Sequence, residues 1–159
     1  MCGRYVITSA PEAIRALFRY WEQPDFPPRY NVAPTQPVPI VRLASGVRSF
    51  ALVRWGFVPA WVKDPRNFTL LVNARGESVG ERAAFKNAMA RRRCLFPADG
   101  FYEWKAGGEK SRPLLRPTAA QRADCLCGIV GGLDGAERRG GRDRLHCHHR
   151  GEPDIGADP

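Results

Sequence analysis

The chain has 159 residues, which fits a single domain, and a formal net charge of +9 that arginine largely supplies. This basic balance favours a polyanionic partner, because guanidinium groups contact phosphates in a bidentate manner. The sequence has no apolar signal region and no run long enough to span a membrane, so we expect a cytoplasmic protein without a membrane partner. Five cysteines, an odd number without framework spacing, agree with a reducing compartment.

Two helices are expected in the first hundred residues. Residues 9–12 have the pattern of a capping box with a proline early in the helix, and Pro24 is expected to end that helix. A second helix is expected over residues 80–93. Their apolar stripes are Ile14, Leu17, Phe18 and Trp21 in the first helix, and Phe85, Ala88 and Met89 in the second.

Four strands are also expected in this region. Residues 38–43 and 47–57 have strand composition and are joined at Ser45-Gly46, which predicts a hairpin. Residues 94–96 and 101–105 are expected to form short strands around the turn-forming segment 97–100, Pro-Ala-Asp-Gly.

The composition changes after Pro113. All sixteen aromatic residues lie at or before Trp104, whereas all three histidines and three of the five cysteines lie within residues 125–149. Residues 131–144 have almost no apolar content, which predicts disorder. The spacing of these cysteines and histidines is poor for a zinc site, so we expect no metal and no cofactor.

Cys2 directly follows the initiator methionine, which is readily removed before a small residue. The new N-terminus would carry an α-amine and a thiol that both titrate near neutral pH. Such a 1,2-aminothiol condenses with an aldehyde through its amine and closes a thiazolidine ring through its thiol. It is equally suited to act as a nucleophile with its own amine as the base. On the first five residues alone, a chance cysteine at position 2 is an equal alternative.

Five segments along residues 1–113 together resemble one family. They are Met-Cys-Gly-Arg-Tyr at 1–5, Tyr-Asn-Val-Ala-Pro-Thr at 30–35, Arg-Trp-Gly-Phe-Val-Pro-Ala-Trp at 54–61, Asn-Ala-Arg-Gly-Glu at 73–77 and Pro-Ala-Asp-Gly-Phe-Tyr-Glu-Trp at 97–104. In this order they resemble the SOS-response-associated peptidase family, the abasic-site processing proteins. The resemblance implies one α+β domain with a barrel-like β core and flanking helices.

The resemblance also implies a chemistry. Members of the family release Met1 by autoproteolysis and form a thiazolidine with the aldehyde of an abasic site in single-stranded DNA. By resemblance, Cys2 is the covalent nucleophile and Asn73 bonds near the Cys2 amine and the sugar. Glu103 resembles the carboxylate that moves protons during ring opening and imine formation. The expected protein is a monomer that associates with the nucleoid when it is bound to DNA.

The remaining site assignments concern DNA contacts. Arg4 and Arg75 resemble phosphate-contacting arginines, and Trp55 and Trp61 offer stacking surfaces for unpaired bases. Each of these assignments has a structural alternative, and so does each assignment of a catalytic residue. Asn73 fits a turn residue, Glu103 an ion-pair partner, the two arginines solvated charges, and the two tryptophans core residues.

The family pattern stops after residue 113. The family continues with further core strands and a His-x-Arg-Met-Pro motif, and neither is found here. Residues 123–133 permit a coding in which the next reading frame gives the family's next core strand. We therefore expect residues 1–113 to be the first two-thirds of the domain, and 114–159 to be an out-of-frame, disordered tail. The C-terminal core strands and the catalytic histidine would then be missing and activity impaired.

Two other functions remain open at this stage. One is a non-catalytic basic fragment that binds single-stranded DNA. The other is an N-terminal-nucleophile glutamine amidotransferase, since those enzymes also begin with Cys-Gly. Their oxyanion hole usually uses an Asn-Gly pair, which this sequence does not contain.

Overall fold

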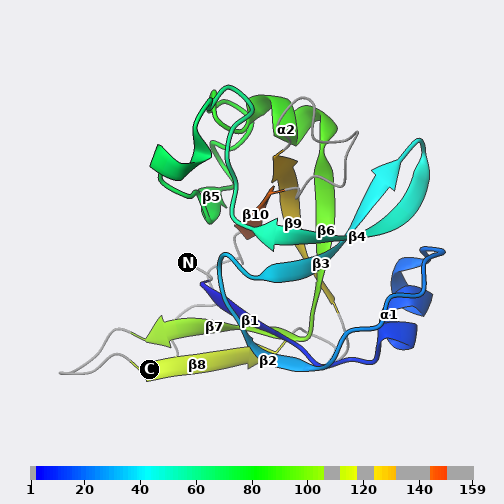
Figure 1. Cartoon of the computed structure of the whole chain (residues 1–159). Helices are drawn as coiled ribbons and strands as arrows, with labels where there is room; N and C mark the ends of the chain where they lie inside the picture. Colours follow the sequence, from blue (N-terminus) through cyan, green and yellow to red (C-terminus); the bar gives the residue numbers. More distant parts are fainter. Residues whose placement is uncertain (1–2, 106–111, 118–123, 132–143, 150–159) are drawn as a thin grey trace.

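The computed structural model describes residues 3–105, 112–117, 124–131 and 144–149. The described strands form two sheets, with two α-helices and one short 3-10 helix beside them (Figure 1). The expected α+β class is confirmed. The strands are divided between two sheets, however, and do not form one closed barrel. No helix in the described residues is long and apolar enough to cross a membrane.

The small sheet has four antiparallel strands, and its inner strands come from distant parts of the chain. In spatial order they are β2 (Arg29–Val32), β1 (Arg4–Ile7), β7 (Gly100–Lys105) and β8 (Arg112–Pro117). The first strand of the chain therefore lies between β2 and a strand that begins more than ninety residues later.

The large sheet has six strands. In spatial order they are β4 (Val47–Trp55), β3 (Pro37–Ala44), β6 (Arg93–Ala98), β9 (Asp124–Gly131), β10 (Arg144–His149) and β5 (Asn73–Arg75). Neighbouring strands are antiparallel except β10 and β5, which are parallel. β10 also pairs with the end of β4, so this sheet curls back toward its first strand.

The predicted hairpin is confirmed. β3 and β4 pair along their full length, from Pro37 opposite Arg54 to Ala44 opposite Val47. The two loop residues, Ser45 and Gly46, have φ angles of 51° and 81°. Positive φ at both positions is typical of a type I′ turn, whose twist matches that of the flanking strands.

The predicted helices are shorter than expected, and the capping box is wrong. α1 spans Pro11–Phe18, and its N-cap is Ala10, which makes no side-chain cap. Ser9 instead donates its hydroxyl to the Asp99 carboxylate. The predicted stripe is only half buried, since Leu17 and Trp21 are 52% and 89% exposed. α2 spans Lys86–Arg91 and, as predicted, packs Phe85, Ala88 and Met89 inward.

Residues 97–100, which were predicted to form a turn, instead carry the chain from the large sheet into the small sheet. β6 ends at Ala98 and β7 begins at Gly100, with Asp99 between them. The Asp99 carboxylate accepts hydrogen bonds from the N–H groups of Thr8 and Ser9, at 2.6 and 2.9 Å. The Asp99 N–H donates to the carbonyl of Val6 at 2.9 Å. One continuous segment thus serves both sheets, and the start of the chain is bonded to the crossing point.

Aromatic side chains fill the space between the sheets. Tyr5 of β1 meets the edge of Trp55 of β4, with ring centroids 5.5 Å apart, and Phe96 of β6 at 6.4 Å. All three side chains are fully buried. A second cluster lies under α2, where Phe57 and Phe85 are 5.3 Å apart and Ile129 of β9 is buried with them.

Three described strands lie wholly or mostly in the range expected to be a disordered tail. β9 pairs with β6 from Arg93 to Ala98, and it contributes Ile129 to the second cluster. The described part of this range therefore contributes strands to both sheets. That residues 114–159 are out of frame stays a prediction.

We expect Asp99→Ala to lower the free energy of unfolding by about 2 kcal/mol, because the N–H groups of Thr8 and Ser9 lose a charged acceptor. Burial raises the Asp99 pKa, but the hydrogen bonds from Ser9 and Thr8 outweigh this, and the pKa lies below its ordinary value. A carboxylate with a lowered pKa stabilises the fold above its unfolded pKa, and this contribution is lost as pH falls through the folded pKa.

Urea unfolding of the wild type and Asp99→Ala at pH 7 and pH 3 measures this effect. The difference between the two proteins should shrink at pH 3. If the free energies of unfolding of the two proteins differ by the same amount at both pH values, the charge of Asp99 does not stabilise the segment between β6 and β7.

Candidate functional site

The strand register places Glu103 beside the beginning of the chain. β1 pairs with β7 so that Arg4 lies opposite Tyr102 and Tyr5 opposite Phe101. Continued by one residue, this register would set Gly3 opposite Glu103. Cys2, the predicted nucleophile, lies outside the described residues. The residue that follows it, Gly3, is half-buried.

Glu103 lies on the inner side of the small sheet. Side chains two residues apart on a strand share a face, so Glu103 shares the face of the buried Phe101. Its Oε2 accepts a hydrogen bond from Nε of Arg116 at 3.1 Å. The two side chains, Arg116 and Glu103, are 50% and 38% exposed, so this ion pair is open to solvent. The ion-pair role that the sequence left open for Glu103 is thus present, and a small molecule can still reach the carboxylate.

Sequence reasoning missed Arg116. It lies on β8 opposite Phe101, and it reaches along the sheet to Glu103. No signal pointed to it, because its segment was interpreted as part of the out-of-frame tail.

Asn73 comes from the large sheet. It is the first residue of β5 and is half-buried. Val72, directly before it, packs against the main core. In Figure 1, β5, the beginning of β1 and the end of β7 all lie on the left side of the molecule. β5, which begins with Asn73, is therefore on the same side of this view as the paired ends of β1 and β7.

The two predicted phosphate contacts differ in their surroundings. Arg4 is half-buried, and its Nη1 donates to Oδ1 of Asn31 on the neighbouring strand at 2.8 Å. This bond holds the guanidinium against β2, the edge strand of the small sheet. Arg75, at the end of β5, is exposed.

The two tryptophans have different roles. Trp55 is 0% exposed and packs on Tyr5 in the main core, so the alternative of a core residue holds for it and no base can stack on it. Trp61 is 63% exposed. Its ring meets Phe68 edge-on, with centroids 5.8 Å apart and planes at 90°. Only Trp61 of this pair presents a ring to solvent.

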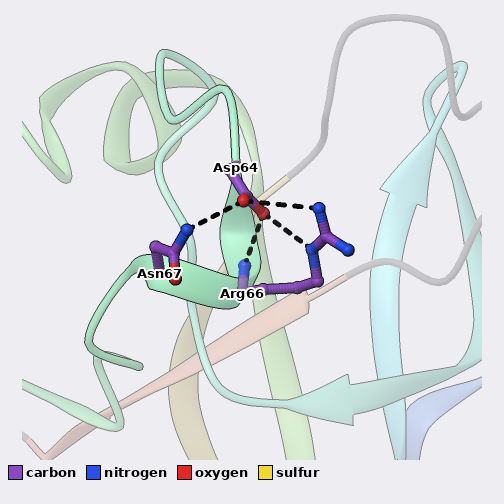
Figure 2. A network of polar contacts seen from close by, with 3 residues as sticks. All are labelled: Asp64, Arg66 and Asn67. Atoms are coloured by element: carbon purple, nitrogen blue, oxygen red, sulfur yellow. Dashed lines mark hydrogen bonds and ion pairs between the residues drawn. The ribbon is translucent and has the colours of Figure 1, made fainter.

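Hydrogen bonds stabilise the loop that carries Trp61, both where the loop begins and ends and near its centre. At the base, Phe57 and Leu71 exchange backbone hydrogen bonds of 2.7 and 3.2 Å. In the middle, Asp64 caps the 3-10 helix Pro65–Asn67 (Figure 2). Its carboxylate accepts from the Arg66 N–H and Nε at 3.0 and 3.1 Å, and from Nδ2 of Asn67 at 3.0 Å. The Arg66 side chain is the main cause that holds the pKa of Asp64 below its ordinary value.

Within the described part of the chain, no group of three or more His, Cys, Asp or Glu side chains is placed to hold a metal ion. The site residues that the structure does describe offer a carboxylate, an amide, guanidinium groups and an exposed indole.

A family model described as SOS response associated peptidase (SRAP) matches residues 1–144. The chain belongs to the SRAP family. This match extends past residue 113, where the resemblance seen in the sequence ended.

Curated relatives of this SRAP chain carry names that refer to one lesion. Abasic site processing protein YoaM of Bacillus subtilis is 34% identical over 119 residues, which is 73% of this chain and 52% of that protein. Abasic site processing protein YedK of Escherichia coli is 33% identical over 121 residues, covering 72% and 53%. HMCES of Xenopus tropicalis, with the same description, is 29% identical over 139 residues, covering 71% and 42%. This chain thus spans about half the length of these bacterial relatives.

Solved structures share the fold. A phage-related protein of Bordetella bronchiseptica superposes with a TM-score of 0.74 at 24% identity, over 92% of this chain and 68% of that one. A protein of Bacteroides thetaiotaomicron has the same TM-score of 0.74 at 19% identity, over 92% and 66%. At these identities the likeness shows the SRAP fold alone.

Substitution of the two tryptophans tests which of them belongs to the core and which to the candidate site. We expect Trp55→Ala to lower the free energy of unfolding by about 3–5 kcal/mol, because it empties the centre of the core. Trp61→Ala should change it by less than about 0.5 kcal/mol, since the ring is mostly in solvent. Urea denaturation of both variants measures the two effects. Similar losses in both would place Trp61 in a packed environment and remove it from the candidate site.

Proposed function

We propose that this chain processes abasic sites in single-stranded DNA through a covalent link at Cys2. The observation that supports this most is the β1–β7 register, which pairs Arg4, two residues after Cys2, with Tyr102, the neighbour of Glu103. The names of the curated relatives support the lesion as the target.

The proposed reaction begins with hydrolysis of the peptide bond between Met1 and Cys2, in which one water molecule is consumed, methionine leaves and the α-amine of Cys2 is freed. The ring-opened sugar of an abasic site carries an aldehyde. The amine adds to this carbonyl and one water molecule leaves, which gives an imine. The thiol of Cys2 then adds to the imine carbon, its proton passes to the nitrogen, and a five-membered thiazolidine closes. No redox step or cofactor is required.

Glu103 is the proposed proton carrier in this sequence. Opening the sugar ring and losing water both need a group that gives and accepts protons within hydrogen-bonding reach. The carboxylate is open to solvent and held by Arg116 from one side. Asn73 is proposed to bond near the amine and the sugar.

The DNA strand is proposed to pass along Arg4 and Arg75, with an unpaired base on Trp61. Arg4 is fixed by Asn31, and Arg75 and Trp61 are exposed. Guanidinium groups neutralise phosphates, and an exposed indole stacks on any base. Trp55 has no part in this path because it is buried.

A second candidate is binding of single-stranded DNA without covalent chemistry. The observation that favours it is the Arg116–Glu103 ion pair, which gives Glu103 a structural role. Oligonucleotides with and without an abasic site separate the two candidates, because only the first forms an adduct that survives denaturing electrophoresis.

Cys2→Ala should abolish the adduct with abasic single-stranded DNA, because both the thiol and the ring closure are lost. Cys94→Ala is the matched control. Cys94 is buried in the core and away from solvent, so this variant should retain the adduct. A denaturing gel measures both. A stable adduct from Cys2→Ala would exclude the thiazolidine.

Glu103→Gln should slow adduct formation by about 10²–10⁴-fold with little loss of DNA affinity, since proton transfer contributes to rate. Arg4→Ala and Arg75→Ala should instead weaken binding. Each should lower the slope of log K against log salt by about 0.7, because each removes one phosphate contact from a single strand. Single-turnover rates at saturating DNA and binding curves over a salt series measure these effects. Equal loss of affinity in all three variants would contradict this division of roles.

A further inference from the structure

A second basic surface lies away from the candidate site. It is a hollow of about 300 Å³ lined by Arg42, Arg91, Arg92 and Arg93, with Leu43, Ala44 and Ser45 forming the rest of its wall. We call it the arginine hollow. No acidic residue of the described chain lines it.

Three elements bring these arginines together. Arg91 is the last residue of α2, Arg93 is the first residue of β6, and Arg92 joins them. The N–H of Arg92 donates to the carbonyl of Ala88 at 2.7 Å, which fixes the connection. Arg42 comes from β3, where it lies opposite Cys94 of β6. The ladder between β3 and β6 therefore holds the hollow in shape.

One more arginine lies close to the hollow. A neighbouring groove of about 530 Å³, whose other lining is apolar, shares Arg42, Leu43 and Arg93 with it and adds Arg48. Arg48 is held in place by a bond of 3.0 Å from its Nη1 to the carbonyl of Phe18. Like charges gathered in this way repel one another. A bound anion relieves this repulsion.

The chemistry of the hollow selects phosphate. Guanidinium groups match the oxygen atoms of phosphate in a bidentate manner and are weakly hydrated. The hollow has no aromatic residue among its described lining on which the base of a free nucleotide would stack. This favours a ligand recognised by its phosphates alone, which is the backbone of a nucleic acid.

The position of the hollow shows which part of the DNA it can meet. The tip of the β3–β4 hairpin beside it points to the right in Figure 1, whereas β5 and the end of β7 lie on the left. We propose that the arginine hollow binds backbone phosphates of DNA at a distance from the abasic nucleotide. This inference rests on the proposed function, which it extends from the lesion to the flanking DNA.

The test compares two double variants of the full chain that remove the same charge. Arg91→Gln with Arg93→Gln changes the hollow. Arg15→Gln with Arg82→Gln is the control, because Arg15 lines a different hollow that also contains Glu12 and Asp25, and Arg82 bonds to Ser78. Binding is measured on intact oligonucleotides with flanking sequence, over a salt series.

The hollow variant should lower the slope of log K against log salt by about 1.4 for single-stranded DNA, which corresponds to two lost phosphate contacts. The control should change it by less than half as much. Arg91→Lys with Arg93→Lys should restore most of the slope, which separates lost charge from damage to the fold. Equal changes in the hollow and control variants would overturn the proposal.

Two further arms identify the ligand. If inorganic phosphate or a short acidic peptide binds the wild type but not the hollow variant, while the two proteins bind DNA with the same salt slope, the assignment to DNA is overturned. Adduct formation at saturating abasic DNA should be unchanged in the hollow variant. If the wild type forms no adduct while the hollow still sets the salt slope, the proposed function fails and this inference stands.

Discussion

In this protein, the segment that runs from β6 straight into β7 changes sheets at Asp99. A carboxylate at this point accepts hydrogen bonds from Thr8 and Ser9, and its backbone bonds to Val6. These contacts attach β1 and the residues that follow it to the point where β6 passes into β7. Tyr5 of β1 packs on Trp55 of β4 and Phe96 of β6, so this ring cluster joins strands of both sheets. The candidate site depends on the crossing as well, since Glu103 follows it along β7.

Local patterns predicted those elements whose shape is set by neighbours in sequence. The Ser45-Gly46 hairpin is an example, because positive φ at two adjacent residues is enough to define the turn. The apolar stripe of α2 is another. The segment 97–100 was misinterpreted because Pro, Ala, Asp and Gly together have turn composition, while the partners that extend it lie ninety residues earlier. The capping box failed for the same reason, since Ser9 bonds to Asp99 instead of its own helix.

The candidate site was predicted in part. The resemblance supplied Asn73, Glu103 and the arginines, and the structure adds what surrounds them. Trp55 and Trp61 lie six residues apart in one motif, and sequence alone did not distinguish a core indole from an exposed one. Their difference arises because Trp55 ends β4 against Tyr5, whereas Trp61 lies in a loop shaped by Asp64. Arg116 was missed because its ion pair with Glu103 joins two strands, β8 and β7, and no local sequence pattern indicates such a contact.

The segment shared by the two sheets also bears on the order in which the chain can fold. During synthesis β3 and β4 are neighbours and can pair as soon as they emerge, whereas β1 has β2 on one side and must wait for β7 on the other. Closing so long a stretch carries a large entropic cost before any contact compensates for it. The first residues of the nascent chain therefore stay without their inner partner until Gly100–Lys105 has been made. The end of the chain that is synthesised first is among the last parts of the fold to be completed.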